Sequence, residues 1–376
     1  MAAHPHLVAG QARALAADAR ARWPDLAEDA AEANAFLAPA MLGAALDHLA
    51  APGAVRLIEA VEGDRLIGLL PVVVAPRHGR LPIACVANWM HDHSFFGAPI
   101  VRRGREAAAW SSFLDQLDRA PWAPHFLHLS SLDAAGANAA ALEAVCTAER
   151  RGLREVHRYD RALLRSDLPA EVYWETHVRG KKRKEIRRLQ KRLAELGTVE
   201  ERLLADQADL TRWCGEFLRL EQSGWKGREG TALACAPSHA AFFRAACAAA
   251  SDMGQLHFLR IDLDGRPIAM LVNFRHGEGA FSFKIAFDEE LGRFSPGVLI
   301  EIANLHAVQG DPAIAWMDSC AAPDHPMIDS LWAERRSIVQ YRVALKGAGG
   351  ARLRRAVAFA AVDGAERLAK ITRGHA

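Results

Sequence analysis

Residues 279–309 hold the arrangement in this sequence that suggests chemistry most directly. Residues 280–287 have the apolar pattern of a β-strand, and a helix is expected to begin at Ser295, Pro296 and Gly297. Ser295 suits the N-cap, and Pro296 suits the first helical position because its missing N–H costs nothing there. Gly297 leaves the next backbone N–H groups uncovered. A strand that leads into an open helix N-terminus is a natural anion site, although the same three residues also suit a plain helix start.

Histidines and aromatic residues gather at residues 88–97, Asn-Trp-Met-His-Asp-His-Ser-Phe-Phe-Gly. His91 and His93 would point the same way only on a strand, and no fourth ligand is evident, so we expect no metal site. The polar end of an apolar pocket suits this segment better, with plain core packing as the alternative.

Nine Lys or Arg side chains fall within fourteen residues, at positions 179–192. Ile186, Leu189, Leu193 and Leu196 form an apolar stripe beneath them, so we expect a docked helix with a charged outer face. The charges are either simply solvated or face the phosphates of the donor, an acidic carrier protein, anionic lipid headgroups or tRNA.

The composition is that of a globular protein, and the length suits two domains of typical size. The chain has 376 residues, of which 51% are hydrophobic and 24% are charged, and its net charge is +2. This near-neutral charge argues mildly against nucleic acid as a partner. The six cysteines include no C-x-x-C pair, which favours reduced thiols. The first 23 residues lack a long apolar core, so a secretory signal is not expected there.

The elements that must position these residues follow from periodicity and turns. A helix is expected within residues 31–50, then a hairpin of strands 55–61 and 65–74, and a third strand at 81–87. In the second half a basic helix precedes a strand at 198–203, two helices, and a hairpin of strands 256–263 and 267–275 joined by Asp264 and Gly265. Residues 65–70 and 266–271 align at the same place in the two hairpins, which favours an internal duplication.

This order of elements resembles the GNAT N-acyltransferase fold. From about residue 179 to residue 288 the chain is similar to the CelD-like acetyltransferase family, a double-GNAT group related in architecture to the FemABX peptidyltransferases. The resemblance rests on the basic helix ending in Leu-Ala-Glu-Leu-Gly and on Ser-Gly-Trp-Lys-Gly-Arg at 223–228. It also rests on Asp-Gly-Arg-Pro-Ile-Ala at 264–269, Phe-Lys-Ile-Ala-Phe-Asp at 283–288 and Ser-Pro-Gly at 295–297.

The resemblance implies an α/β (α+β) fold class with two tandem GNAT-like domains, each a twisted mixed sheet flanked by helices. Residues 1–165 would form the acceptor side and residues 166–376 the domain that binds the acyl donor. The implied reaction transfers an acyl group from an acyl thioester, acyl-CoA or acyl-ACP, to an amine, with no metal. The usual Q/R-x-x-G-x-G/A pyrophosphate loop is replaced by Leu-Gly-Arg-Phe-Ser-Pro-Gly at 291–297, so the donor stays open between coenzyme A, a carrier protein and aminoacyl-tRNA.

Within the resemblance, the donor lies where the strands around Phe283 and Trp316 separate. The expected donor-binding residues are Phe283, Ile285, Arg293, Ser295, Pro296 and Gly297.

An amine must lose a proton before it attacks, and an imidazole is the side chain that ordinarily serves as a base near working pH. We therefore expect His325 as the base, with Asp318 or Asp324 orienting it; an ordinary loop histidine is the alternative. Lys284 is expected either to line the cleft or to pair with Asp288, which shares its face of the strand.

The acceptor is expected between the two halves. Residues of the aromatic segment, the loop after residue 223 and the end of the central strand would line it: Trp89, His91, His93, Phe95, Phe96, Trp225, Lys226, Arg228 and Asp288.

Several functions remain open at this point. The apolar loop and the basic face favour long-chain acylation of a sphingoid base, as in the bacterial ceramide synthase type. A polysaccharide or amino-sugar N-acetyltransferase of the CelD type, a FemABX-like aminoacyl transferase, and a non-catalytic GNAT relic that binds membrane or nucleic acid are the alternatives. The expected location is cytoplasmic, with peripheral contact at the inner face of the membrane through residues 179–192.

Overall fold

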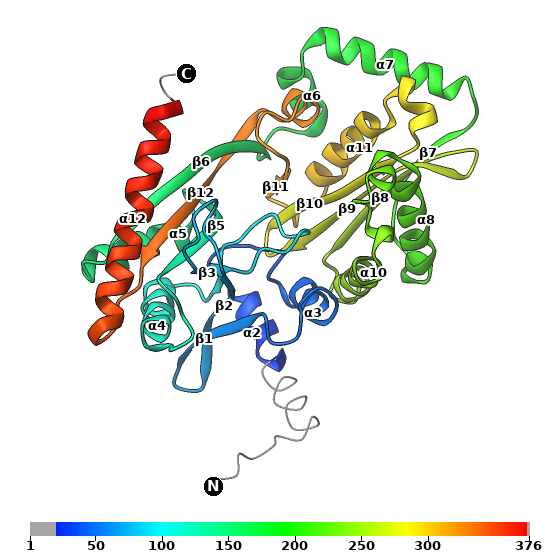
Figure 1. The fold of residues 1–376 in the computed structure, drawn as a ribbon. Coiled ribbons are helices and arrows are strands. Elements are labelled where there is room, and N and C mark those ends of the chain that lie inside the picture. Colours follow the sequence, from blue (N-terminus) through cyan, green and yellow to red (C-terminus); the bar gives the residue numbers. More distant parts are fainter. Residues whose placement is uncertain (1–19, 374–376) are drawn as a thin grey trace.

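The structure is a computed structural model that describes residues 20–373, with side chains described to residue 367. The expectation for the N-terminal segment falls mainly on residues 1–19, which lie outside this range. Figure 1 shows the elements of the first half in blue to green: α2 (Trp23–Glu28), α3 (Pro39–His48), β1 (Arg56–Glu62), β2 (Arg65–Ala75), β3 (Cys85–Asn88), β4 (Ile100–Val101), α4 (Glu106–Arg119), β5 (Phe126–Asp133), α5 (Ala137–Ala148) and β6 (Leu153–Leu164).

The second half begins with two helices and ends with a long one. Its elements are α6 (Ala170–His177), α7 (Gly180–Ala194), β7 (Val199–Leu203), η1 (Gln207–Asp209), α8 (Leu210–Ser223), α9 (Trp225–Arg228), η2 (Leu233–Cys235), α10 (Pro237–Asp252), β8 (Leu256–Leu263), β9 (Arg266–His276), β10 (Gly279–Phe287), η3 (Glu289–Phe294), α11 (Pro296–Gly310), β11 (Trp316–Asp318), η4 (Ile328–Ser330), β12 (Glu334–Ala344) and α12 (Gly349–Arg373).

All the strands belong to one mixed sheet that runs through both halves. Its order is β1-β2-β3-β5-β12-β6-β11-β10-β9-β8-β7, and β4 pairs with β2. Helices α8 and α10 cover one face of the second half and α11 covers the other, as Figure 1 shows. This large twisted sheet flanked by helices confirms the expected fold class.

The two halves repeat the same sequence of pairings. Hairpin β1–β2 is followed by β3, which lies parallel to β5, and hairpin β8–β9 is followed by β10, which lies parallel to β11. Asp264 and Gly265 both have positive φ (49° and 76°), the backbone that a tight two-residue hairpin needs. The arrangement agrees with the expected duplication.

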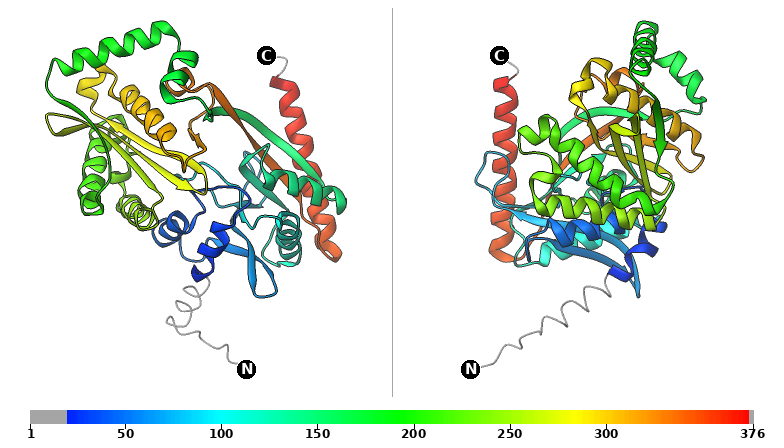
Figure 2. Two further views of the ribbon diagram at one scale, coloured as in Figure 1. Left: turned by 180° about the vertical axis from the view of Figure 1, so that it is seen from behind. Right: turned by 90° about the vertical axis from the view of Figure 1, so that its right-hand side faces the viewer.

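The last strand of the chain lies inside the first half. β12 pairs antiparallel with β5 on one side and with β6 on the other. Helix α12 follows it and places Val362 against Cys85 and Phe126; Figure 2 shows α12 along one side of the molecule. Although residues 166–376 were expected to form the second domain, their final strand and helix complete the sheet and core of the first half.

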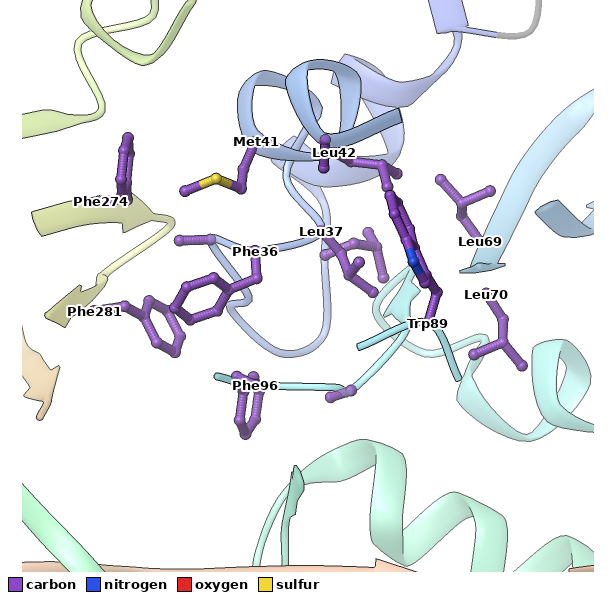
Figure 3. Close-up of a cluster of buried hydrophobic side chains, with 14 of the residues drawn as sticks. Phe36, Leu37, Met41, Leu42, Leu69, Leu70, Trp89, Phe96, Phe274 and Phe281 are labelled. Atoms are coloured by element: carbon purple, nitrogen blue, oxygen red, sulfur yellow. The ribbon is translucent and has the colours of Figure 1, made fainter. Parts of the chain in front are cut away.

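Aromatic side chains from both halves meet in a shared core. Phe36 contacts Phe281 edge-on, with ring centroids 5.6 Å apart, and Trp89 and Phe96 belong to the same buried cluster. Figure 3 shows Phe274 and Phe281 facing Phe36 and Met41 from the first half. The two halves are therefore joined by hydrophobic packing.

A histidine of the second half forms hydrogen bonds with two backbone groups of the first half. The Nδ1 atom of His276 accepts the backbone N–H of Asn34 at 2.9 Å, and its Nε2–H donates to the carbonyl of Ala27 at 3.1 Å. The ring must be neutral to accept the first bond. Burial lowers the pKa of His276 to about 4, and the hydrogen bond to Ala27 opposes this shift.

We expect this contact to weaken the protein in mild acid. Because the folded-state pKa lies below the unfolded value of about 6.5, the stabilisation is present above pH 6.5 and is lost as the pH falls toward 4. Between pH 7.5 and pH 5 the contribution of His276 should fall by about 2 kcal/mol. Urea unfolding of wild type and His276→Gln at both pH values measures it. Equal pH dependence in the two proteins would contradict the prediction.

Some boundaries differ from the sequence expectation for identifiable reasons. The helix expected within residues 31–50 is reduced to α3, because Pro39 starts it and Asn34 folds the preceding segment through bonds to the carbonyls of Phe96 and Ala98. The strand expected at residues 81–87 is shortened to β3, and Leu196 is exposed rather than part of the apolar stripe under α7.

Candidate functional site

Strands β10 and β11 pair only briefly before they separate. Their three partner pairs are Gly279 with Trp316, Ala280 with Met317 and Phe281 with Asp318. β11 ends there, while β10 continues to Phe287 and carries a bulge between Ser282 and Lys284. The backbone of β10 beyond Phe281 is therefore free of a strand partner on this side among the described residues. A ligand with carbonyl and amide groups can pair with such an edge.

A buried carboxylate with two ammonium groups lies beside this stretch. Glu221 of α8 is 2% exposed, and its Oε1 lies 3.7 Å from Nζ of Lys284 and 3.4 Å from Nζ of Lys226. Its Oε2 accepts the backbone N–H of Leu233 at 2.8 Å. Burial lowers the pKa of Lys284, and Glu221 opposes this shift. Asp92 is a second negative charge that acts on Lys284, so the two ammonium groups are balanced overall, and Lys284 is the cation on β10 itself that could face an oxyanion.

Histidines from both halves meet next to Lys284. His93, on the segment after β3, is 4% exposed and stacks on Phe242 of α10 at 5.6 Å, and its ring lies 4.8 Å from that of His239. Neither of its ring nitrogens has a hydrogen-bond partner among residues 20–367. Burial, followed by the charge of Lys284, lowers the pKa of His93 to about 3, and burial lowers that of His91 to about 4. Both rings are therefore neutral near pH 7.

The first half thus contributes directly to the surroundings of β10, but only part of the expected acceptor wall is open. His91 and Phe95 are half-buried, and His93 and Phe95 contact Phe283. Trp89 and Phe96 are buried in the core that joins the halves, where they pack instead of lining an open space (Figure 3).

The loop after α8 is tied to the segment that follows β10. The carboxylate of Glu289 accepts the backbone N–H of Trp225 and pairs with Arg228, both at 2.7 Å. A cavity of about 20 Å³ remains between this loop and β10, lined in part by Glu221, Lys226 and Ile285. Asp288 accepts the N–H of Glu290 and pairs with Arg266 at 2.8 Å, so it begins η3 and does not pair with Lys284.

The helix start at residues 295–297 differs from the expected open anion site. Ser295 adopts a left-handed conformation (φ 54°) and makes no side-chain capping bond, although Pro296 does begin α11. Gly297 is buried, and a Cβ there would lie 3.1 Å from the ring of Phe287. Close packing against β10 therefore accounts for this glycine. Arg293 is exposed, with its guanidinium 4.8 Å from the Phe294 ring, and Ile285 is half-buried on β10.

Asp318 is committed to an ion-pair network and does not orient His325. Its Oδ2 accepts from Arg161 at 2.7 Å and from Arg336 at 2.8 Å, and its Oδ1 accepts the backbone N–H of Cys320. Asp324 is exposed with φ 57°. Within residues 20–367, no hydrogen bond joins His325 to either aspartate. His325 lies before η4 with Nδ1 buried and unpartnered, and its role as a base stays a prediction.

Several residues of this region were not singled out from the sequence. Glu221, His239, Arg161 and Arg336 come from distant segments, and their neighbours appear only when the sheet is assembled. In the described part of the chain, no group of three or more His, Cys, Asp or Glu residues is arranged to hold a metal ion. No helix of residues 20–373 combines the length and apolarity that a membrane crossing requires.

Comparison with known proteins identifies the domain type of the second half. Residues 180–323 match the family model of the acetyltransferase (GNAT) domain. The separated parallel strands β10 and β11, with α11 between them in the sequence, fall within that match. The second half therefore has the GNAT-type acyltransferase fold.

Solved structures extend the likeness over both halves. A crystal structure of FemX matches 86% of this chain and 95% of its own, with a TM-score of 0.54 and 9% identity. A conserved protein of unknown function from Bacteroides thetaiotaomicron matches 87% of this chain and 97% of its own, with a TM-score of 0.52 and 12% identity.

A third likeness involves the C-terminal DUF2156 domain of a proposed lysylphosphatidylglycerol synthetase from Agrobacterium fabrum. It covers 87% of this chain and 91% of the domain, with a TM-score of 0.52 and 12% identity. No curated protein matches the chain. These likenesses show a shared fold.

Proposed function

We propose that this protein transfers an acyl group from a thioester to a primary amine. The observation that carries this proposal is the free edge of β10 beyond Phe281, with the ammonium group of Lys284 on that strand. The amine nitrogen forms a bond to the thioester carbon, the carbon–sulfur bond breaks, and the sulfur leaves as a thiol. The amine proton passes to a base of the protein, which returns a proton to the leaving sulfur.

The residues around the gap suit the requirements of this reaction. Backbone N–H groups along Ser282–Phe287 would hold the donor, and Phe283 and Ile285 lie on that stretch. Lys284 would stabilise the oxyanion that forms on the carbonyl oxygen. His91 and His93 reach this point from the first half, which supports an acceptor site between the halves.

For proton removal we keep His325 as the first candidate and add His93. Each has at least one buried ring nitrogen that forms no hydrogen bond with another described residue, so that nitrogen could accept a proton once a substrate displaces what covers it. His93 also contacts Phe283 on β10, with ring centroids 6.3 Å apart.

We expect replacement of the true base to lower kcat by about 100-fold or more, because general-base catalysis typically supplies 10²–10⁴-fold. His325→Ala and His93→Ala are compared in the same steady-state assay, with the exposed His177→Ala as the matched control. Loss in one variant assigns the base. Full activity in both variants would show that neither His325 nor His93 is the general base.

For the acceptor we propose a long-chain amine of the sphingoid type, as in bacterial ceramide synthases. The aromatic surroundings of His93, which include Phe95, Phe242 and Phe283, support an apolar acceptor. An amino sugar or polysaccharide amine of the CelD type is the second candidate, favoured by the sequence similarity of residues 179–288. The name of the Agrobacterium fabrum neighbour refers to a lipid product, whereas the FemABX likeness supports aminoacyl transfer.

Thioester consumption tests these proposals directly. Acetyl- and palmitoyl-coenzyme A are each offered with a sphingoid base and with an amino sugar. Turnover of the palmitoyl donor with the sphingoid base supports the lipid acceptor. Turnover only with the acetyl donor and sugar moves the assignment to the CelD type. If no pair reacts, a carrier-protein donor and a non-catalytic binding module remain, and RNA or liposome binding with steep salt dependence favours the binding module.

A further inference from the structure

Helix α7 presents an outer face made of cations. Its exposed side chains Lys181, Lys184, Arg187, Arg188, Lys191 and Arg192 recur at three- and four-residue spacing, so they form one stripe about 17 Å long. Arg188 pairs with Glu185 at 2.7 Å. No ion pair is made by the other five with any carboxylate of the described residues. These five cations are therefore available to a partner.

The opposite face of α7 is fixed to the second half. Ile186, Leu189 and Leu193 are buried, and two of them belong to the core cluster that contains Phe294 and Leu299. The helix is therefore a docked part of the fold that holds its charges outward; Figures 1 and 2 show it along the outside of the molecule, above α11.

The surroundings of the stripe limit what it can bind. Exposed carboxylates border it at both ends, Glu171 and Glu175 before the helix and Glu195 and Glu200 after it. This narrow strip suits one acidic helix better than a long phosphate backbone, which needs an extended basic surface. No large apolar side chain is exposed within residues 180–194, so α7 offers charge and no group to insert into a membrane.

Helix α7 also packs against the segment between β10 and α11, with its stripe on the outward side. α7 contacts η3, the segment that directly follows β10 and precedes α11. In that segment the N–H of Ser295 bonds to Gly292, those of Val298 and Leu299 bond to Ser295, and Gly297 is packed against Phe287. With these amides engaged, few remain to hold the phosphates of a free donor, and Arg293 is the exposed cation of η3 itself.

We propose that α7 docks an acidic acyl carrier protein, which delivers its thioester arm past η3 to β10. The inference rests on the proposed acyl transfer and names the source of the thioester. Carboxylates on a helix of the carrier pair with Lys184, Arg187 and Lys191, and the pantetheine arm extends from that contact. Opposite charges speed the encounter of two proteins and fix their register.

The test measures carrier binding and turnover separately. The probe is a purified palmitoyl-loaded acyl carrier protein, with palmitoyl-coenzyme A as the carrier-free donor. The variant Lys184→Glu/Arg187→Glu/Lys191→Glu is compared with a control of equal net charge, Arg80→Glu/Arg352→Glu/Arg354→Glu, whose residues are exposed on other elements. A Gln triple at the α7 positions checks that the effect follows charge, and circular dichroism checks that α7 remains folded.

We expect the α7 variant to raise the dissociation constant for the loaded carrier at least tenfold and to lower kcat/KM for that donor similarly. Turnover of palmitoyl-coenzyme A should stay within twofold, and wild-type binding should weaken steeply with salt. Carrier binding that is equal in the α7 variant and the control overturns the proposal. The proposal is also overturned if the wild-type protein does not bind the carrier and the α7 variant selectively loses binding to RNA or to anionic vesicles. If the carrier binds through α7 but no thioester reacts, docking stands and the proposed acyl transfer fails.

Discussion

Replacing Lys284 with methionine is expected to lower kcat by about 100-fold, the typical effect of removing one group that stabilises a developing oxyanion. Methionine keeps the length and apolar contacts of the side chain but removes its charge. Lys226 remains to pair with Glu221, so the buried carboxylate is not left alone. The loss should appear in kcat more than in KM, because the interaction strengthens as the carbonyl oxygen gains charge.

Two matched variants make the Lys284 result interpretable. Lys284→Arg keeps the positive charge and should retain more activity than Lys284→Met. Lys226→Met removes the other ammonium group near Glu221. In the wild type this ammonium also donates a hydrogen bond to the carbonyl of Ile285 at 3.1 Å. If Lys284→Met turns over at the wild-type rate and is only less stable, Lys284 serves a structural ion pair and the oxyanion role is excluded.

Arg161→Ala should be the most destabilising single substitution in the network around Asp318. It leaves a buried carboxylate with only Arg336 and removes the bond from Arg161 to the carbonyl of Phe95, which is 2.8 Å long. Removing one partner of a buried ion pair typically costs about 3–5 kcal/mol. Urea unfolding at pH 7 measures the loss. Arg158→Ala on the same strand is the control, because its pair with Glu155 is exposed and its loss should cost far less.

The pH dependence of the Arg161 variant gives a second check. Burial alone would raise the pKa of Asp318, but Arg161 and Arg336 together lower it below its ordinary value. The stabilisation is therefore present above about pH 4 and is lost as the pH falls through the folded-state pKa. Wild type should lose stability more steeply than Arg161→Ala in this range. A similar loss for both proteins, or a cost near that of Arg158→Ala, would contradict the buried-pair interpretation.

Local patterns in the sequence predicted the elements that depend on neighbours in the chain. The Asp264-Gly265 turn fixed a hairpin because its backbone requires two residues with positive φ. The strand at residues 280–287 and the helix after Pro296 were predicted within one residue or two. The basic helix was also expected with its apolar stripe inward, since a 3.6-residue period is visible without any tertiary contact.

Features that depend on assembly could not be predicted in this way. Asp318 follows an apolar strand and resembles a residue aimed at substrate, yet Arg161 and Arg336, which neutralise it, are separated from it by 157 and 18 positions. From the sequence alone, a glycine at position 297 is equally compatible with an open helix N-terminus and with close packing against a strand. Glu221 lies on a helix whose buried face is otherwise apolar; Lys226 follows it by five positions, but its second partner, Lys284, becomes visible only after β10 is placed.

The position of β12 has a consequence for how the chain reaches its native state. Strands β5 and β6 are complete once residue 164 has been synthesised, but the strand that lies between them ends only at Ala344. During translation these two strands expose unpaired edges while some 180 further residues emerge. Such edges are prone to pair with other chains. The first half therefore finishes folding last, and a protein truncated before residue 334 should aggregate even though its N-terminal sequence is intact.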